Sequence, residues 1–322
     1  MNRFAYLALA VIVVVALWAG GWFFLASQVR GAVESLAAND GETAPRVTCE
    51  RLGVGGFPFR FDVDCAGAQI RSGDLTVAVP EIGVSALVYR PTHFIGAAQG
   101  PATLSDAFTG ARNSLSWSAL DASLRIADWR IERFSLVGRD LNWSDTLFGE
   151  ALIASSSEGE VHLIDIPEQL DREAGRAALA GYARLAGLDA PAFAVAGGEA
   201  QLETELTGLP ADLRLLGEPD ALRAWQQAGG QLRIVSLNAT AGEDYLRADG
   251  EVSLNDAGQA EGQLRIASRG VVERIEGLFP EPYRGLLLGQ PAPDGSYSNT
   301  INLRGGVIAS GMMPAGIIPP LF

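Results

Sequence analysis

The stretch EAQLETEL at Glu199–Leu206 alternates between two kinds of side chain, residue by residue. Its even-numbered positions carry Ala, Leu, Thr and Leu, whereas the positions between them carry Gln201, Glu203 and Glu205. Successive side chains of a β-strand point to opposite faces of the sheet. The stretch therefore predicts an antiparallel strand with one buried face and one solvated face.

The same period of two recurs along the chain. A hairpin is expected where the turn Asn255–Gly258 joins Leu246–Leu254 to Gln259–Ala267. The pentapeptide GQLRI occurs at 230–234 and again at 262–266, which favours a repeated strand unit over coincidence in a chain rich in Gly, Leu and Arg. Further alternating segments are Leu75–Val79, Ala122–Ile126 and Glu160–Ile166. We expect a mainly-β protein with a large antiparallel, curved sheet.

Few helices are expected after the N-terminal region. The segment Glu168–Leu188 is rich in Ala, Leu and Arg and has apolar residues at helical spacing. A short helix is expected from a cap at Asp220 to Gly229, and another over about Val271–Leu278. Residues 31–322 are expected to form one β-rich domain, with a subdivision near 167–190 as an alternative.

Residues Phe4–Ala26 form an uncharged run. As a helix this run is about 35 Å long, enough to cross a hydrocarbon core of about 30 Å. The apolar region of a cleavable signal peptide is usually shorter, at about 7–15 residues. Trp18 and Trp22 near the far end are typical of a membrane interface. An uncleaved anchor is favoured, with a cleavable signal peptide as the alternative.

The orientation of this anchor depends on few charges. Arg3 favours a cytoplasmic N-terminus, whereas Arg30 on the other side argues against it. All 38 acidic residues follow Arg30. We expect residues 1–30 to be a cytoplasmic tail and a single transmembrane helix, with residues 31–322 displayed across the membrane.

Cys49 and Cys65 enclose a Phe-rich stretch with the alternation of a hairpin. Folding this stretch about residue 57 places the two cysteines opposite each other, where paired strand positions lie about 4.5–5.5 Å apart. A disulfide is therefore predicted, which suits an oxidising compartment. The alternative is a pair of buried free thiols.

Composition excludes several kinds of function. The 24 basic residues are all Arg, so a P-loop lysine, a Schiff base and a Ser-x-x-Lys nucleophile are absent. The net charge of −14 disfavours binding to nucleic acid. Neither His93 nor His162 lies in a catalytic or metal-binding motif. We expect no cofactor, no metal site and no catalytic residues.

Two apolar segments are candidates for docking to a membrane or a partner protein. One is the hairpin, through Phe57, Phe59 and Phe61. The other is the C-terminal tail, since the last 18 residues carry no charged side chain. The alternative for the tail is a last strand followed by residues that cover the end of the sheet. The tail residues considered for docking are Ile317, Ile318, Leu321 and Phe322.

Four segments together resemble an uncharacterised bacterial family, domain of unknown function 2125. They are GFPFRFDVDC at 56–65, AWQQAGGQLRIVSLNA at 224–239, LRADGEVSLNDAGQAEGQLRI at 246–266 and GGVIASGMMPAGIIPPLF at 305–322. The resemblance implies a bacterial envelope protein with an N-terminal membrane segment, anchored in the inner membrane with its main domain in the periplasm. It implies no catalytic residues.

Three functions are compatible with these observations. The first is a non-enzymatic envelope protein, anchored through residues 4–26, that holds lipid or another apolar ligand in a β-groove, by analogy of architecture with AsmA-like lipid-handling proteins. The second is a scaffold or assembly partner that docks to an envelope protein through its hairpin or C-terminal tail. The third is a hydrolase whose site unites His93 or His162 with acidic residues.

Overall fold

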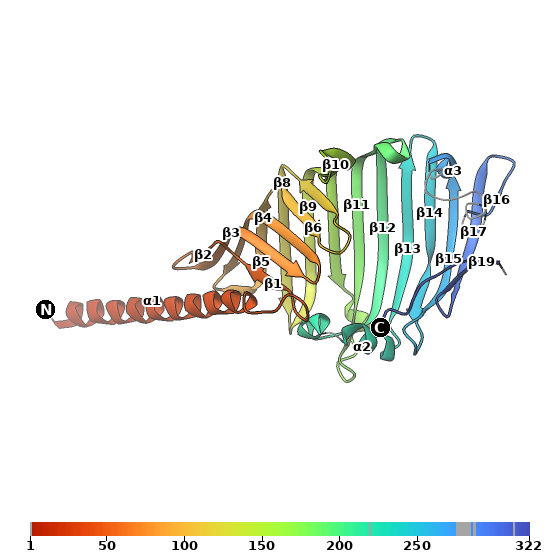
Figure 1. The fold of residues 1–322 in the computed structure, drawn as a ribbon. Helices are drawn as coiled ribbons and strands as arrows, with labels where there is room; N and C mark the ends of the chain where they lie inside the picture. The colour runs from red at the N-terminus through yellow and green to blue at the C-terminus, as the bar shows by residue number, and fades with distance from the viewer. Residues whose placement is uncertain (1, 219, 275–284, 286–287, 312) are drawn as a thin grey trace. The chain divides into compact units, whose positions relative to one another are not determined.

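A computed structural model describes residues 2–218, 220–274, 285, 288–311 and 313–322 (Figure 1). Contacts between Cα atoms divide the chain into two compact units, Met1–Leu115 and Ser116–Phe322. The protein is mainly β, as predicted: the described residues form nineteen strands that pair in antiparallel fashion. The subdivision considered near 167–190 lies inside the second unit.

The first unit consists of a long apolar helix followed by short and medium strands. The helix is long and apolar enough to cross a membrane, which is typical of a signal sequence or a membrane anchor. The elements are α1 (Asn2–Leu36), β1 (Arg46–Thr48), β2 (Arg51–Gly55), β3 (Arg60–Ser72), β4 (Leu75–Leu87), β5 (Arg90–Gln99), β6 (Ala102–Asp106) and β7 (Arg112–Ser116), which ends at the boundary.

The predicted hairpin is formed by β2 and β3. Cys49 and Cys65 form a disulfide with their Cα atoms 5.3 Å apart. The register differs from the expected one, because Cys65 pairs with Leu52 and not with Cys49. Cys49 lies between β1 and β2, where the chain leaves the sheet. At this interruption Gly67 has φ +63° and a Cβ atom there would meet the Glu50 side chain, so glycine is favoured at this position.

The second unit is a meander in which β8 to β15 pair with their neighbours in chain order (Figure 1). Beyond β15 the order continues through β17, β18 and β19. The elements are β8 (Ala119–Ala127), β9 (Arg130–Asp145), β10 (Ala151–Asp165), η1 (Pro167–Gln169), β11 (Arg176–Ala190), η2 (Pro191–Phe193), β12 (Val195–Pro210), η3 (Leu213–Gly217), α2 (Ala221–Gln227), β13 (Gln231–Ala241), β14 (Asp244–Leu254), β15 (Ala260–Arg269), α3 (Val271–Arg274), β16 (Gln290–Pro291), β17 (Ser296–Arg304), β18 (Val307–Ser310) and β19 (Met313–Ile317).

One predicted helix is wrong. Most of Glu168–Leu188 belongs to strand β11, and only the 3-10 turn η1 is helical there. The Ala, Leu and Gly residues of β11 also alternate with period two, and the strand pairs along its length with β10 on one side and β12 on the other. Pairing on both edges outweighs the weak helical preference of Ala and Leu.

The other local predictions agree with the structure where its residues are described. The hairpin of β14 and β15 has its turn at 255–258 as expected. Helix α2 follows Asp220 and ends before Gly229. Helix α3 confirms the start of the segment expected over Val271–Leu278, and residues 275–278 lie outside the described residues.

Candidate functional site

An unbroken row of apolar side chains crosses eight neighbouring strands of the second unit, from β8 to β15. Each member is the cross-strand partner of the next, so all of them lie on one face of the sheet. The row is Ala122, Leu136, Val161, Ala183, Leu202, Leu237, Ala248 and Ile266. At a strand spacing of about 4.8 Å the row is about 34 Å long. We call the face that carries this row the apolar face.

A β-bulge keeps the row intact in β13. Ile234 pairs with Gly250 and Leu237 pairs with Ala248, so two residues of β13, Val235 and Ser236, face one residue of β14. The extra residue returns Leu237 to the same face as Ile234. The bulge is visible in the sequence QLRIVSLNA. Its apolar residues have even numbers before the bulge (Leu232, Ile234) and odd numbers after it (Leu237, Ala239).

None of the eight side chains in the row is buried by the described residues. Val161 is 38 % exposed, and the other seven are intermediate in exposure. In a two-layered sheet protein the equivalent side chains pack against a second layer and become the core.

One end of the apolar face is covered. Ala260, Ile301 and Leu303 form a buried cluster against which Ile308 and Ile318 pack. The C-terminal tail continues over the turn between β14 and β15, where the Leu321 N–H donates to the Gly258 carbonyl. The tail therefore closes this end of the sheet with residues of its own chain.

A small apolar hollow of about 170 Å³ lies beside α3. Leu188, Ala239 and Leu246 contribute to it from neighbouring strands. Arg274 and Asp244 also line it and form an ion pair with each other. The hollow thus combines apolar walls with one charged pair.

The opposite face of the sheet is polar and is held together by cross-strand ion pairs. Arg265 pairs with Asp249, and this hydrogen bond raises the pKa of the guanidinium. Arg184 hydrogen-bonds to Glu199, which raises the pKa of Arg184 in the same way. Exposed pairs of this kind contribute little stability because solvent and salt screen them. Their consequence here is a face whose charges largely satisfy one another.

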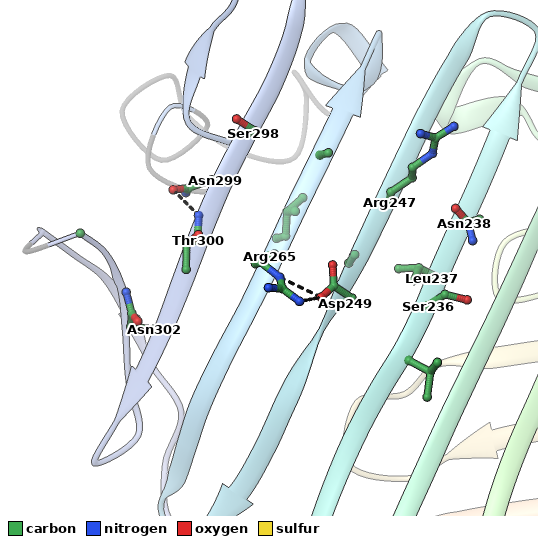
Figure 2. A pocket seen from close by; sticks show the side chains of 15 residues that line it. Ser236, Leu237, Asn238, Arg247, Asp249, Arg265, Ser298, Asn299, Thr300 and Asn302 are labelled. Atoms are coloured by element: carbon green, nitrogen blue, oxygen red, sulfur yellow. Dashed lines mark hydrogen bonds and ion pairs between the residues drawn. The ribbon is translucent and has the colours of Figure 1, made fainter.

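An open hollow of about 800 Å³ is lined by polar residues together with Leu237, Ala248 and Ile266 of the row (Figure 2). Figure 2 shows Arg265 of β15 and Asp249 of β14 side by side, with Arg247 on the same strand as Asp249 and Asn238 on the neighbouring strand β13. Its lining offers hydrogen-bond donors and acceptors from β13, β14, β15 and β17. The arrangement suits a hydrated polar surface.

The structure places His162 in a row of three polar groups on the polar face. Its Nδ1 atom lies 2.9 Å from the Ser135 hydroxyl and its Nε2 atom lies 3.0 Å from the Glu160 carboxylate. These are the groups of a hydrolytic triad. However, His162 lies in β10 and pairs with β9 and β11 on either side, so nearby backbone N–H groups are used in the sheet and are not free to form an oxyanion hole.

The other histidine and the metal-binding groups give no second site. His93 lies in β5 of the first unit. Among the residues that the structure describes, no three His, Cys, Asp or Glu side chains are grouped to hold a metal ion.

The Phe-rich hairpin of the first unit packs against α1. The Trp22 and Phe61 rings stack with centroids 5.4 Å apart, and Phe57 contacts the edge of Trp22 at 5.5 Å. Trp18 contacts Phe59 at 6.4 Å. The hairpin residues considered for docking therefore meet the apolar helix of their own chain. We call Gly56–Phe61 the hairpin tip.

The tail residues considered for docking divide between two environments. Ile318 packs on the buried cluster, and Arg223 lies over the ring of Phe322 at 5.1 Å. Ile317 and Leu321 are exposed. The tail is thus in part a cover for the sheet and in part an apolar surface.

These features define a mainly-β protein with an N-terminal apolar helix of the signal or anchor type. Residues 22–319 match the family described as "Uncharacterized protein conserved in bacteria (DUF2125)", and the chain belongs to this family. The comparisons with curated proteins and with solved structures found no match.

The contact between α1 and the hairpin gives a testable prediction. Trp22 is 5 % exposed and donates its indole N–H to the Arg60 carbonyl at 3.0 Å. Replacing a buried Trp with Ala costs about 3–5 kcal/mol. We expect Trp22→Ala in the full-length protein to speed amide hydrogen exchange in β2 and β3 by about 100-fold or more.

The matched control is Phe24→Ala, since Phe24 lies two residues away on the same helix and is 62 % exposed. This variant should leave exchange in β2 and β3 unchanged. Equal exchange rates in the two variants would show that α1 does not pack on the hairpin.

Proposed function

We propose that this protein is a non-enzymatic envelope protein that holds the acyl chains of lipids on its apolar face. In this proposal α1 is an uncleaved anchor in the bacterial inner membrane, with its N-terminus in the cytoplasm and the β-rich units in the periplasm. The observation that carries the proposal is the row of eight apolar side chains, none of them buried by described residues.

The dimensions of the row support an acyl chain as the ligand. An acyl chain spans about half of a hydrocarbon core of about 30 Å. The row is about 34 Å long, so it is long enough to accommodate an acyl chain. Apolar burial contributes about 25 cal/mol per Å² and has no directional requirement, so a flexible chain can bind without specific polar contacts. The apolar hollow beside α3 provides further surface of the same kind.

The location in the envelope has two supports. The disulfide between Cys49 and Cys65 suits an oxidising compartment such as the periplasm. The family match begins at Trp22, within α1, so the second half of this helix belongs to the family's shared region. A retained anchor agrees better with this than a removed signal sequence.

The ligand can be tested by native mass spectrometry of the full-length protein, purified gently from membranes. We expect co-purifying phospholipid, and we expect the paired substitutions Leu202→Gln and Leu237→Gln to reduce the lipid-bound fraction at least tenfold. These two residues are direct cross-strand partners in the middle of the row.

The control is the neighbouring pair on the polar face, Gln201→Thr and Asn238→Thr. These substitutions should leave the lipid-bound fraction unchanged. Absence of lipid from the wild-type protein, or an equal loss in both pairs, would contradict the proposal. A stoichiometric protein partner in place of lipid would favour the alternative, an envelope scaffold, for which the exposed Ile317 is the supporting observation.

A hydrolase is the remaining candidate, and the row of Ser135, His162 and Glu160 is the observation that favours it. A fluorophosphonate probe labels an activated serine covalently, so it tests this site directly. We expect no labelling above that of Ser135→Ala, because the backbone N–H groups of the paired strands around Ser135 are used in the sheet. Labelling that disappears in Ser135→Ala would establish a nucleophilic serine and overturn the non-enzymatic proposal.

A further inference from the structure

The hairpin tip contacts α1 close to the middle of its apolar stretch. The apolar residues of α1 that precede this contact are too few to span a membrane. Contact with the hairpin begins at Trp18, whose indole N–H donates to the Pro58 carbonyl at 3.1 Å. It continues through Trp22 to Arg30, which donates to the Leu52 carbonyl at 3.2 Å. The apolar stretch before this contact is Phe4–Leu17.

Fourteen helical residues from Phe4 to Leu17 are about 21 Å long, whereas the hydrocarbon core is about 30 Å thick. The missing 9 Å corresponds to about six more residues of helix, Trp18–Phe23. These are the residues that carry the aromatic contacts to Phe57, Phe59 and Phe61. If α1 spans the membrane, its partner in this contact must lie at the same depth.

We propose that the hairpin tip is inserted in the acyl region of the bilayer beside α1, as a second membrane-embedded element. This inference rests on the proposed anchor role of α1. In this proposal the exposed aromatic rings of the tip face lipid. Phe59 is 63 % exposed and Phe57 is 48 % exposed, and both continue the proposed lipid-facing surface of the helix.

Four backbone carbonyls of the tip have partners within the protein. Inside a bilayer each backbone polar group needs a partner from the protein. The Pro58 and Arg60 carbonyls accept from the indoles of Trp18 and Trp22. The Phe59 carbonyl accepts from the Val88 N–H at 2.9 Å, and the Gly56 carbonyl accepts from the Arg60 N–H at 3.1 Å.

Proline and arginine in the tip agree with the same placement. Pro58 has no N–H group that would need a partner. The Arg60 Nε atom forms an ion pair with Asp62 at 2.7 Å, on the part of the strand that leads away from the tip. A long Arg side chain held in this direction reaches toward the headgroups while its stem stays in the apolar layer.

The turn between β4 and β5 extends this surface. Val88 lies in that turn and lines an apolar hollow of about 150 Å³ together with Trp18, Trp22 and Phe61. Its neighbour Tyr89 is exposed. Tyr is enriched at membrane interfaces because its ring is apolar and its hydroxyl is polar.

The test uses the full-length protein in vesicles of phosphatidylethanolamine and phosphatidylglycerol, with the photoreactive residue p-benzoylphenylalanine in place of Phe59. We expect irradiation to give lipid adducts, detected by mass spectrometry, in at least tenfold higher yield than the same residue in place of Phe108. Phe108 is an equally suitable control because it is more exposed, at 85 %. It follows Ala107, whose N–H binds the Asp74 carbonyl at the opposite end of β3 and β4.

A second probe position, Tyr89, guards against a local disturbance at position 59 and should also give lipid adducts. Equal yields at positions 59 and 108, or adducts at 59 to another polypeptide in place of lipid, would overturn the inserted tip. Extraction with alkaline carbonate separates the two failures. Release of the protein by carbonate would contradict both the proposed anchor and the inserted tip. Protein that is retained but gives no lipid adducts would contradict only the inserted tip.

Discussion

The second unit depends on one constraint: a β-strand presents alternate residues to opposite faces, and this chain places apolar residues on the same face in strand after strand. Burying a Leu or Val side chain fully is worth about 1.5–3 kcal/mol. The row from Ala122 to Ile266 obtains only part of that gain, because none of its members is buried by the described residues. A ligand that covers the row would recover the remainder, and this is the physical basis of the proposed apolar ligand.

The first unit also depends on exposed apolar side chains, and in our proposal the bilayer covers them. Its helix exposes large apolar side chains over most of its length, and the hairpin tip adds Phe57 and Phe59 to that surface. Trp22 connects the two elements, since it stacks on Phe61 and caps the Arg60 carbonyl. The contact holds the second half of the helix against the hairpin.

The sequence predicted the periodic parts of this structure well and the long-range parts poorly. The alternation at Glu199–Leu206 and the hairpin turn at Asn255–Gly258 depend only on neighbouring residues, and both are confirmed. The helix expected at 168–188 fails because Ala and Leu have only a weak helical preference, and pairing with the flanking strands β10 and β12 outweighs it. The partners of His162 and the contact between Trp22 and Phe61 depend on register and tertiary packing, which residue spacing does not specify. The change of parity at Val235 was a readable sign of the bulge.

The central claim is that the apolar face of the second unit is covered by lipid and not by a second layer of protein. An experimental density map of the full-length protein, purified from membranes without exchange of its bound lipid, tests this claim most directly. The account predicts elongated non-protein density along the row that includes Val161, Leu202 and Leu237. A polypeptide segment packed over these residues, with their side chains fully buried by protein, would contradict it.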